Sequence, residues 1–538
     1  MQSFRTFLEE YVERVEPLQR EAHLAYWNAS LSGRETDFAR YADLELAYNR
    51  LHADPRAFAE LERWRREGGV RDQLERRQLD IVHRSHLRNQ IPDDLMEAIT
   101  RLSSTIIARF NVFRARVDGD ELTGNAVREV LRSSPDPRRR RAVWEADKAV
   151  GAEVRDDLLE LVRLRNRAAR SVGFDDYYVM SLALGEQDPG EVAGVFDRLE
   201  ALTREPFARL KAELDEALAA HCAVDPADLR PWHYTDPFFQ EAPRPTDLDL
   251  DRFYRDRDVV SLVRDFFAGI GLDVDPILAR SDLYERPGKE QHAYCIDVDR
   301  RGDVRVLANV RNDEHWTGTM LHELGHAVYD RHLDDSLPFL LREPAHVFVT
   351  EAIAMLFGRL SKEPAWIHAM TGHGHAADGD VAHAARLHQR RHQLVFSRWC
   401  QVMTRFERAL YRAPEADLDA LWWELVARCQ MVTPPEGRRA PDWAAKIHIV
   451  SAPVYYHNYQ LGELLASQLD HALRARVGGD GSRAGYVGQD DVGAYLRENV
   501  FAHGRRYRWE ELVERATGAP LDPRHFVEQY VAGDGQPS

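Results

Sequence analysis

The chain has 538 residues, of which 44% are hydrophobic and 30% are charged, so it is long enough for two or three domains or for one large single-cored enzyme. Its formal net charge of −17 argues against a nucleic-acid partner, because phosphate binding needs a basic face. No apolar run approaches the length of a membrane span, so we also expect no membrane partner.

The N-terminal segment and the cysteines both bear on the cellular compartment. The segment MQSFRTFLEEYVERVEP has no basic stretch followed by an apolar one, so nothing in it predicts secretion. The four cysteines, at positions 222, 295, 400 and 429, include no CxxC pair, which favours free thiols over a disulfide framework. We therefore expect a cytoplasmic protein of unknown oligomeric state.

The first half of the chain has the residue spacing of long helices. Apolar residues recur at helical intervals from Phe4 to Leu18, and similar patterns continue through DDLLELVRLRNRAARSVGF. The basic run Arg138–Arg141 opens one of these helices, and we interpret it as a solvated helical face rather than a phosphate site. The pattern predicts a mainly α-helical fold.

Residues 292–310, HAYCIDVDRRGDVRVLANV, break the helical periodicity. Two β-prone runs flank a turn at Arg301 and Gly302, which predicts a β-hairpin. Helical periodicity resumes at Thr317.

The segment TMLHELGHAVYD, residues 319–330, carries a candidate metal site. On a helix, His322 and His326 lie one turn apart on one face and can point at the same ion, with Glu323 turned toward an adjacent position. Two histidine ligands with a carboxylate that can take a proton from water are typical of zinc peptidases. Taken alone, the motif also fits a polar stripe on a helix.

A candidate third ligand follows in HVFVTEAIAMLF. Glu351 is the only charged residue between His346 and Arg359, and a carboxylate buried in such a segment is costly unless a cation or hydrogen bonds compensate it. A metal ion would compensate it, whereas the alternatives are a Glu351 that faces solvent or one that meets an arginine such as Arg342. Two imidazoles, one carboxylate and an open water position suit zinc.

The segment AAKIHIVSAPVYYHNYQLGELLASQL offers hydrogen-bond donors further along the chain. A peptidase needs donors aimed at the oxyanion that forms during peptide hydrolysis. The segment supplies Lys446, His448, Tyr455, Tyr456 and Tyr459, and the last two stand three residues apart, so that both hydroxyls can face one side of a helix. Tyrosines at helical spacing are also typical of a packed core, so this cluster by itself leaves both interpretations open.

Four motifs together resemble one known family. In chain order they are HELGH, TEAIAMLF with Glu351 25 residues after His326, KIH and YHNY. They resemble the gluzincin peptidases of the angiotensin-converting enzyme type, with thimet oligopeptidase as a more distant relative. The segments HAYCID and LVRLRNRAARSVGFDDY are similar to that family outside the site.

The resemblance implies a single peptidase unit over residues 1–538, mainly α-helical, in which two helical subdomains enclose a deep substrate channel. It implies lid helices over residues 1–100, which would restrict substrates to short peptides, and a helical subdomain over residues 101–290. A small β-hairpin over residues 291–312, beside the HExxH helix, would supply a substrate edge strand. Residues 313–530 would form the zinc-site and oxyanion-site helices.

The resemblance also implies the catalytic residues. One zinc ion per chain would be held by three ligands, His322, His326 and Glu351. Glu323 would act as the general base and later as a proton shuttle. Tyr459, assisted by His448, would stabilise the oxyanion.

Four further residues are implied to bind an oligopeptide substrate. Lys446 matches the lysine that holds the terminal carboxylate of the substrate in the converting enzymes, and Tyr456 matches a tyrosine beside it. His292 and Ala293 would lie on an edge strand that binds the peptide backbone as an added strand. These residues imply a peptide held in a channel with its C-terminus anchored.

The sequence departs from the family pattern in three respects. Asn458 stands where the converting enzymes have a chloride-binding arginine, so chloride activation is not implied. Met355 stands where they have an aspartate that supports a zinc histidine, so that support must come from elsewhere. The glutamine that shares the carboxylate pocket with the lysine has no evident counterpart in the sequence.

We therefore expect a zinc metallopeptidase that hydrolyses short peptides and releases C-terminal dipeptides. One alternative is an oligoendopeptidase of the thimet type. The alternative from another class is a non-catalytic zinc-containing scaffold that binds peptides, and Glu323 argues against it because a pure binding site needs no general base.

A histidine-rich segment is a second metal candidate. Its members are His368, His373, His375, His383, His388 and His392. His388 and His392 have the i, i+4 spacing, but no carboxylate follows either of them and the segment is polar. We interpret it as a solvated surface.

Overall fold

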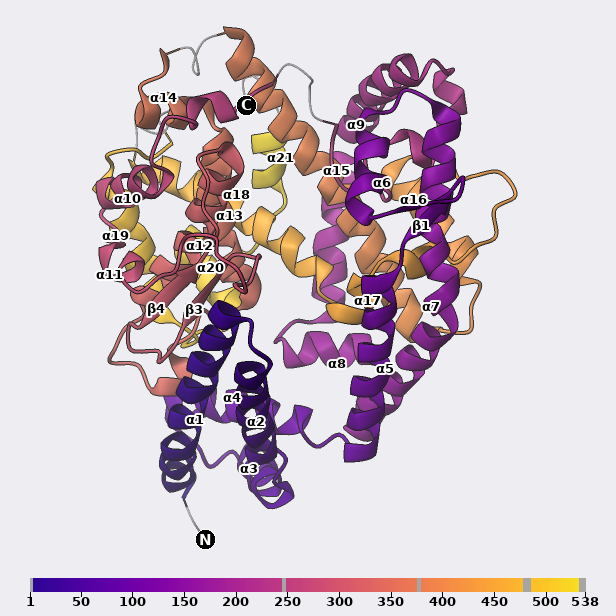
Figure 1. The fold of residues 1–538 in the computed structure, drawn as a ribbon. Helices are drawn as coiled ribbons and strands as arrows, with labels where there is room; N and C mark the ends of the chain where they lie inside the picture. Colours follow the sequence, from indigo (N-terminus) through magenta and orange to yellow (C-terminus); the bar gives the residue numbers. More distant parts are fainter. Residues whose placement is uncertain (1–2, 244–247, 375–378, 478–484, 532–538) are drawn as a thin grey trace. The chain divides into compact units, whose positions relative to one another are not determined.

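The computed structural model describes residues 3–243, 248–374, 379–477 and 485–531. Its fold is mainly α-helical, as predicted, with two small pairs of antiparallel strands (Figure 1). The chain divides into two compact units. The first unit comprises Met1–Gln90, Asp247–Arg386 and Leu461–His525, and the second comprises Ile91–Thr246, Leu387–Gln460 and Phe526–Ser538.

The first unit contains the N-terminal helices and the HExxH helix. Its elements are α1 (Phe4–Ser32), α2 (Glu35–His52), α3 (Pro55–Glu67), α4 (Gln73–Arg88), η3 (Asp251–Phe253), α10 (Val259–Gly269), α11 (Asp275–Leu278), β3 (Tyr294–Asp297), β4 (Val304–Leu307), α12 (Glu314–Arg331), η4 (Phe339–Leu341), α13 (Val347–Gly358), η5 (Arg359–Lys362), α14 (Pro364–Thr371), α19 (Asp490–Asn499), η9 (Phe501–His503) and α20 (Trp509–Thr517).

The second unit contains the longest helices. Its elements are α5 (Asp93–Val112), β1 (Ala115–Val117), β2 (Asp120–Leu122), α6 (Gly124–Ser133), α7 (Pro137–Ser171), α8 (Tyr177–Leu184), α9 (Pro189–Cys222), η1 (Pro226–Asp228), η2 (Pro231–His233), α16 (Leu418–Gln430), η7 (Asp442–Ala445) and α17 (His448–Ser451). Three helices contribute residues to both units: α15 (Gly379–Arg412), α18 (Tyr456–Val477) and α21 (Arg524–Tyr530).

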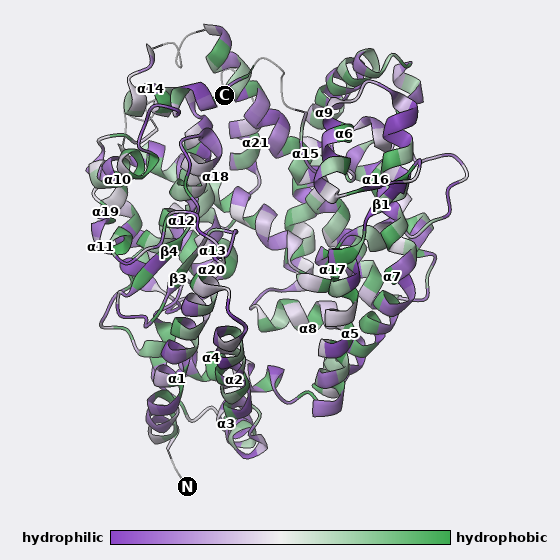
Figure 2. Cartoon of the chain, viewed as in Figure 1, coloured by the Kyte–Doolittle hydropathy of each residue, from purple (hydrophilic) through white to green (hydrophobic). Residues whose placement is uncertain are grey.

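Helices of both units combine apolar and polar residues along their length (Figure 2). In the first unit, the apolar residues of α1, α3 and α4 form a shared hydrophobic core with members Phe4, Leu8, Tyr11, Val15, Leu61, Trp64, Leu79 and Val82. Burial of such side chains stabilises these helices far more than their intrinsic propensity does. In the part of the chain that the structure describes, none of the helices is both long and apolar enough to cross a membrane.

Helix α12 carries the HExxH motif, and its start is fixed by a side-chain cap. The Asp313 carboxylate accepts a hydrogen bond from the backbone N–H of Trp316 at 2.7 Å, which satisfies one of the free donors of the first turn. Helix α13 begins in a comparable way, because the His346 ring accepts from the backbone N–H of Phe348 at 3.1 Å.

Glycines allow α12, α13 and α18 to approach closely. A Cβ atom at Gly325, in the middle of HELGH, would lie 2.8 Å from the Cα of Ala354 on α13. A Cβ atom at Gly462 on α18 would lie 3.3 Å from the Cβ of Glu351 and 3.1 Å from the Met355 sulfur. All three distances to α13 are shorter than the usual separations of Cβ atoms from their neighbours. The close approach of α13 to the HExxH helix and to α18 therefore depends on glycine.

The strands β3 and β4 form an antiparallel pair in which Tyr294 is opposite Leu307 and Asp297 is opposite Val304. Both strands contact α12, so the segment that begins with His292 lies next to the helix that carries the HExxH motif. The turn between the strands has Arg300 and Gly302 in the left-handed region, with φ of 54° and 98°.

The basic run at the start of α7 differs from the prediction at one position. Arg140 is fully buried, and its guanidinium donates hydrogen bonds to the carbonyl oxygens of Ser134, Trp232 and His233 at 2.7 to 2.8 Å. Carbonyl oxygens satisfy the donors of a guanidinium that has been removed from water. The interpretation of the whole run as a solvated face is therefore wrong for Arg140, which ties α7 to the segment around η2.

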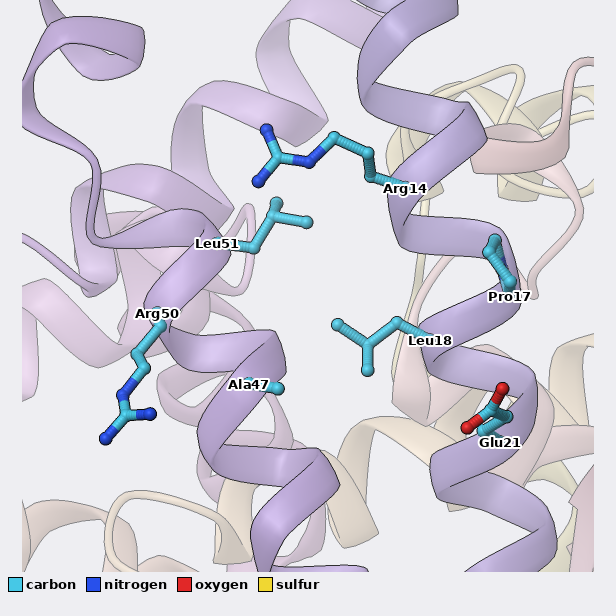
Figure 3. Close-up of a pocket in the computed structure, with 7 residues that line it drawn as sticks. All are labelled: Arg14, Pro17, Leu18, Glu21, Ala47, Arg50 and Leu51. Carbon is cyan, nitrogen blue, oxygen red and sulfur yellow. The ribbon is translucent and has the colours of Figure 1, made fainter.

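A hollow of about 560 Å³ lies between α1 and α2 (Figure 3). Leu18 of α1 and Leu51 of α2 point toward one another across it, and the charged residues on its rim are Arg14, Glu21 and Arg50. This lining has one carboxylate and no histidine or cysteine, so it does not offer a set of metal ligands.

Candidate active site

Three side chains of the first unit converge on one point. The donor atoms of His322 and His326, from α12, and of Glu351, from α13, all lie within 4.8 Å of one another. The carboxylate oxygen Oε2 of Glu351 is 3.7 Å from Nε2 of His322 and 4.0 Å from Nε2 of His326. The histidines and the glutamate that the sequence singled out are therefore neighbours in the fold.

The spacing of these three donors fits a zinc ion. For tetrahedral coordination with ligand distances near 2.1 Å, neighbouring donors stand about 3.4 Å apart. The observed separations of 3.7 and 4.0 Å are slightly longer than this value, and a small rotation of the side chains would bring the donors to the tetrahedral spacing. Two imidazoles and one carboxylate leave a fourth position open, as catalytic zinc sites do.

The electrostatics of the three residues also favour a cation. Burial lowers the pKa of His322 to about 4 and that of His326 to about 3, so both rings are neutral and able to bind a metal at neutral pH. Burial, with a smaller contribution from the charge of Glu463, raises the pKa of Glu351 to about 7. A metal ion would supply the positive charge that this carboxylate lacks.

Glu323 lies beside the three residues and is only 9% exposed. Burial and, to a smaller extent, the nearby charge of Glu351 raise its pKa to about 8, although a hydrogen bond from the backbone N–H of Cys295 opposes the shift. A carboxyl group whose pKa lies close to neutrality can both accept and return a proton, which is the requirement for a general base that later acts as an acid.

The second nitrogen of one histidine has a hydrogen-bond partner. Nδ1 of His326 is 2.7 Å from the hydroxyl oxygen of Thr350. This contact fixes the orientation of the ring and leaves Nε2 directed toward Glu351. Thr350 thus orients one of the histidines, which Met355, standing where the family has an aspartate, cannot do. The sequence analysis did not identify Thr350.

The structure also bears on the alternative partner of Glu351. The Arg342 guanidinium donates to the backbone carbonyls of Leu337 and Asp335, both at 2.7 Å. Two of its three nitrogens are thereby engaged away from Glu351, whose side chain is 16% exposed and faces the two histidines.

The cavity that holds these residues has a volume of about 500 Å³ and lies within the first unit. Its lining includes the three candidate ligands, Glu323 and Thr350, together with residues 293–297 of the hairpin. Ala293 is part of this lining, whereas His292 is exposed just outside it. A peptide beside the metal site would therefore meet the backbone of this strand.

In the second unit, Lys446 is buried and forms part of a polar and aromatic cluster. Its ammonium group donates to Oε1 of Gln240 at 2.8 Å and lies 5.1 to 5.6 Å from the ring centres of Phe238, Trp399 and Tyr456. Burial lowers the pKa of Lys446 to about 8. The loop that carries Gln240 is held by the buried Asp236, which accepts from its backbone N–H at 2.9 Å.

The histidine and tyrosines of the sequence motif lie in the same cluster. The ring of Tyr456 is 5.1 Å from that of His448 and 5.6 Å from that of Tyr459. Burial lowers the pKa of His448 to about 4, and the charge of Lys446 adds to this effect. The structure therefore brings together, within the second unit, the four residues of KIH and YHNY that the sequence analysis selected.

Asn458 has a partner that accounts for its identity. Its Oδ1 atom accepts a hydrogen bond from the side-chain amide of Gln187 at 2.9 Å, and the carbonyl of the same amide is 2.7 Å from Nε2 of His457. An asparagine at this position completes a neutral hydrogen-bond network, for which an arginine would be too long and would carry an additional buried charge.

The comparison with protein families agrees with this geometry. The family model described as angiotensin-converting enzyme matches residues 1–221 and 235–531, nearly the whole chain. The chain belongs to the angiotensin-converting enzyme family. No curated relative matches it.

Membership of the angiotensin-converting enzyme family makes the protein a zinc metallopeptidase, and hence a hydrolase that acts on peptides.

The angiotensin-converting enzyme family pattern includes a glutamine next to the substrate-binding lysine, and sequence reasoning did not locate one here. In the structure Gln240 occupies a place beside Lys446, although the two residues are 206 positions apart. No local motif marks Gln240, since it lies in an irregular segment between η2 and the residues outside the described range.

The histidine-rich segment forms no cluster with the spacing of metal ligands among the described residues. His368 lies on α14, and His383, His388 and His392 lie on α15. His375 lies outside the described residues.

Proposed function

We propose that the protein is a zinc peptidyl-dipeptidase, which releases dipeptides from the C-terminus of short peptides. The observation that carries this proposal is the environment of Lys446. Its buried ammonium group has three donor hydrogens, and one of them is used in a hydrogen bond to Gln240, its hydrogen-bond partner among the described residues. Asp236 and Glu241 act on Lys446 through their charges, but neither forms an ion pair with it in the described part of the chain. A terminal carboxylate would use the remaining donors and form that ion pair.

His322, His326 and Glu351 are the proposed ligands of one zinc ion. Support comes from the separations of their donor atoms and from the neutral state of the two imidazoles. When bound, zinc would supply Lewis-acid activation of a water molecule and of the scissile carbonyl.

Glu323 is the proposed general base. Its carboxylate takes the proton from the attacking water and then delivers it to the nitrogen of the departing amine. Burial of Glu323 and the raised pKa support this role, because a base with a pKa near neutrality retains enough acidity to protonate the leaving group.

Tyr459 and His448 are proposed to stabilise the oxyanion of the tetrahedral intermediate. A phenol and an imidazole N–H are both suitable donors to a developing negative charge. The family membership of the chain and the position of both residues in the Lys446 cluster support this assignment.

The remaining substrate contacts are also proposals. Lys446 and Gln240 would bind the terminal carboxylate next to Tyr456, and the strand that begins at His292 and Ala293 would pair with the backbone of the peptide. The N-terminal helices would act as a lid that restricts access to short peptides. A cytoplasmic location is supported by the four cysteines, all of them described residues, which form no disulfide with one another.

The role of Lys446 predicts a preference for free C-termini. For a series of otherwise identical peptides, amidation of the C-terminus is expected to raise KM roughly 10- to 100-fold, the value of a charge-assisted hydrogen bond. In Lys446→Met the free and amidated peptides should be cleaved equally well. The preference should also fall as pH rises above about 8, because the lysine then loses the charge that attracts the carboxylate.

Lys362→Met is a suitable control, since it removes a lysine that lies on η5 and outside this cluster. This variant should keep the wild-type preference. Mass spectrometry of the products distinguishes released dipeptides from internal cleavage. A wild-type enzyme that is indifferent to amidation would show that Lys446 is not a carboxylate anchor and would favour the oligoendopeptidase alternative.

The hydrogen bond between Thr350 and His326 predicts that Thr350 influences the zinc affinity through the orientation of the histidine ring. Thr350→Val removes the partner of Nδ1 without changing the size of the side chain, so zinc affinity is expected to fall about 10- to 100-fold. Competition with a chromogenic chelator measures this change. Thr319→Val removes a hydroxyl of α12 that donates to the His315 carbonyl of its own helix at 2.9 Å, and it should leave the affinity unchanged.

A further inference from the structure

The cavity of the candidate active site contains a second group of charged residues. In addition to the proposed zinc ligands and Glu323, it is lined by three carboxylate residues, Asp297, Asp330 and Glu343, and by Arg300 and Arg342. All of them belong to the first unit. A peptide that occupies this cavity would therefore meet these charges as well as the metal site.

The arginines of this group are already paired. Arg300 forms an ion pair with Glu343, and its guanidinium lies 4.7 Å from the centre of the Phe339 ring. Arg505 pairs with the same glutamate from outside the cavity. The guanidinium of Arg342 donates to backbone carbonyls. The charge of Arg300 therefore reaches Asp297 and Asp330 without forming an ion pair with either of them.

The two aspartates have no direct ion-pair partner among the described residues, although the charge of Arg300 lowers the pKa of both and so opposes the effect of burial. Asp297 accepts hydrogen bonds from the backbone N–H groups of Arg300 and Asp299 at 2.8 and 3.3 Å. The Asp330 carboxylate accepts a hydrogen bond from the Cys295 thiol, with the sulfur 3.9 Å from Oδ2, and a thiol is a weak donor. Within the described ranges neither aspartate takes part in an ion pair, and burial raises the pKa of both, that of Asp297 to about 6.

These observations point to a positively charged occupant. Both carboxyl groups are partly withdrawn from water, and the charge of Asp297 raises the pKa of Asp330. A cation between or beside such groups stabilises their ionised form. A second metal ion is not favoured, because Asp297, Asp330 and Cys295 do not form a group with the spacing of metal ligands in the described part of the chain. The long, flexible side chain of a lysine or arginine can reach such a pair from a peptide backbone in the same cavity.

We propose that Asp330, together with Asp297, forms a specificity subsite for a lysine or arginine side chain of the peptide substrate. The subsite rests on the proposed function, since it lies in the cavity in which Glu323 would act. Asp330 is a specificity-determining residue and takes no part in the chemical step. Its charge selects peptides that carry a basic residue near the scissile bond.

The test compares peptides that differ at one residue. Lysine, norleucine and glutamate are placed in turn at each position on either side of the scissile bond, and kcat/KM is measured for the wild type, Asp330→Asn and Asp335→Asn. At one position the wild type should prefer lysine to norleucine roughly 10- to 100-fold, the value of a hydrogen bond between charged groups. In Asp330→Asn this ratio should fall to nearly one.

Asp335→Asn is the matched control, because it removes the same charge from an exposed residue of the loop after α12. It should retain the wild-type ratio. A second readout is the dissociation constant of the same peptides, measured by calorimetry with Glu323→Gln and with the double variant Glu323→Gln, Asp330→Asn. The lysine preference should be present in the first protein and absent from the second.

The outcomes separate this inference from the proposed function. A wild type that cleaves the norleucine peptides but shows no preference for lysine at any position overturns the subsite alone. A preference that persists in Asp330→Asn overturns the role of Asp330. A wild type that cleaves none of the peptides overturns the proposed function and the subsite with it.

Discussion

Replacement of Glu323 by glutamine is expected to lower kcat about 10²- to 10⁴-fold, the usual contribution of a general base, while zinc remains bound. The substitution keeps the size of the side chain and its capacity to accept a hydrogen bond from Cys295, but it removes the group that takes up the proton. Steady-state hydrolysis of a short peptide measures the loss, and elemental analysis of the purified variant measures its zinc content.

Glu314→Gln provides the control for this experiment. Glu314 is the first residue of α12 and is also buried. It accepts a hydrogen bond from the Ser361 hydroxyl at 2.7 Å, which an amide oxygen can accept equally well. This variant should retain activity within about threefold of the wild type, as is usual for a well-accommodated substitution away from the reacting atoms. Hydrolysis by Glu323→Gln at the wild-type rate would exclude Glu323 as the base.

Replacement of Glu351 by alanine is expected to abolish both zinc binding and activity. Two histidines alone leave a site with one ligand fewer than catalytic zinc centres have, and the anionic ligand is the one removed. Because a ligand that binds only the folded state stabilises it by about 4 kcal/mol at 1,000 times its dissociation constant, added zinc should raise the melting temperature of the metal-free wild type. That increase should be absent from Glu351→Ala.

Two further variants show whether the loss of zinc binding is due to the missing ligand. Glu351→Gln keeps the volume of the side chain between α13 and α18, so it separates loss of the ligand from a packing defect near Gly462. Glu323→Gln should still show the increase in melting temperature with zinc. Full zinc occupancy in Glu351→Ala would remove Glu351 from the ligand set.

The proposed metal site could be predicted from the sequence because the signals for its residues are local. The i, i+4 spacing of His322 and His326 fixes their common face as soon as the segment is helical, and no distant residue is needed. Glu351 was identified because it is a single charge in an apolar helix, where it needs compensation. The structure places these three residues together, and the glycine at position 325 of the same motif allows the helices to approach.

The residues that support the proposed ligands and Lys446 could not be predicted from the sequence, because the three-dimensional path of the chain brings them into contact. Thr350 precedes Glu351 and has no distinctive signal, but the packing of α13 on α12 places its hydroxyl 2.7 Å from His326. Gln240 meets Lys446 across 206 residues, and Arg140 is buried by the segment around residue 232, more than 90 positions away. None of these contacts produces a pattern in the sequence.

The sequence by itself determined the helical class, the position of the hairpin segment and the three residues proposed to hold zinc, because helix periodicity and the cost of an isolated buried charge act over a few residues. Only the tertiary structure decided which groups support those residues and which charges share their cavity. The role proposed for Asp297 and Asp330 depends on the fold, since a carboxylate needs a compensating partner only when folding withdraws it from water. Folding also determines whether a nearby arginine, such as Arg300, is already paired with another carboxylate.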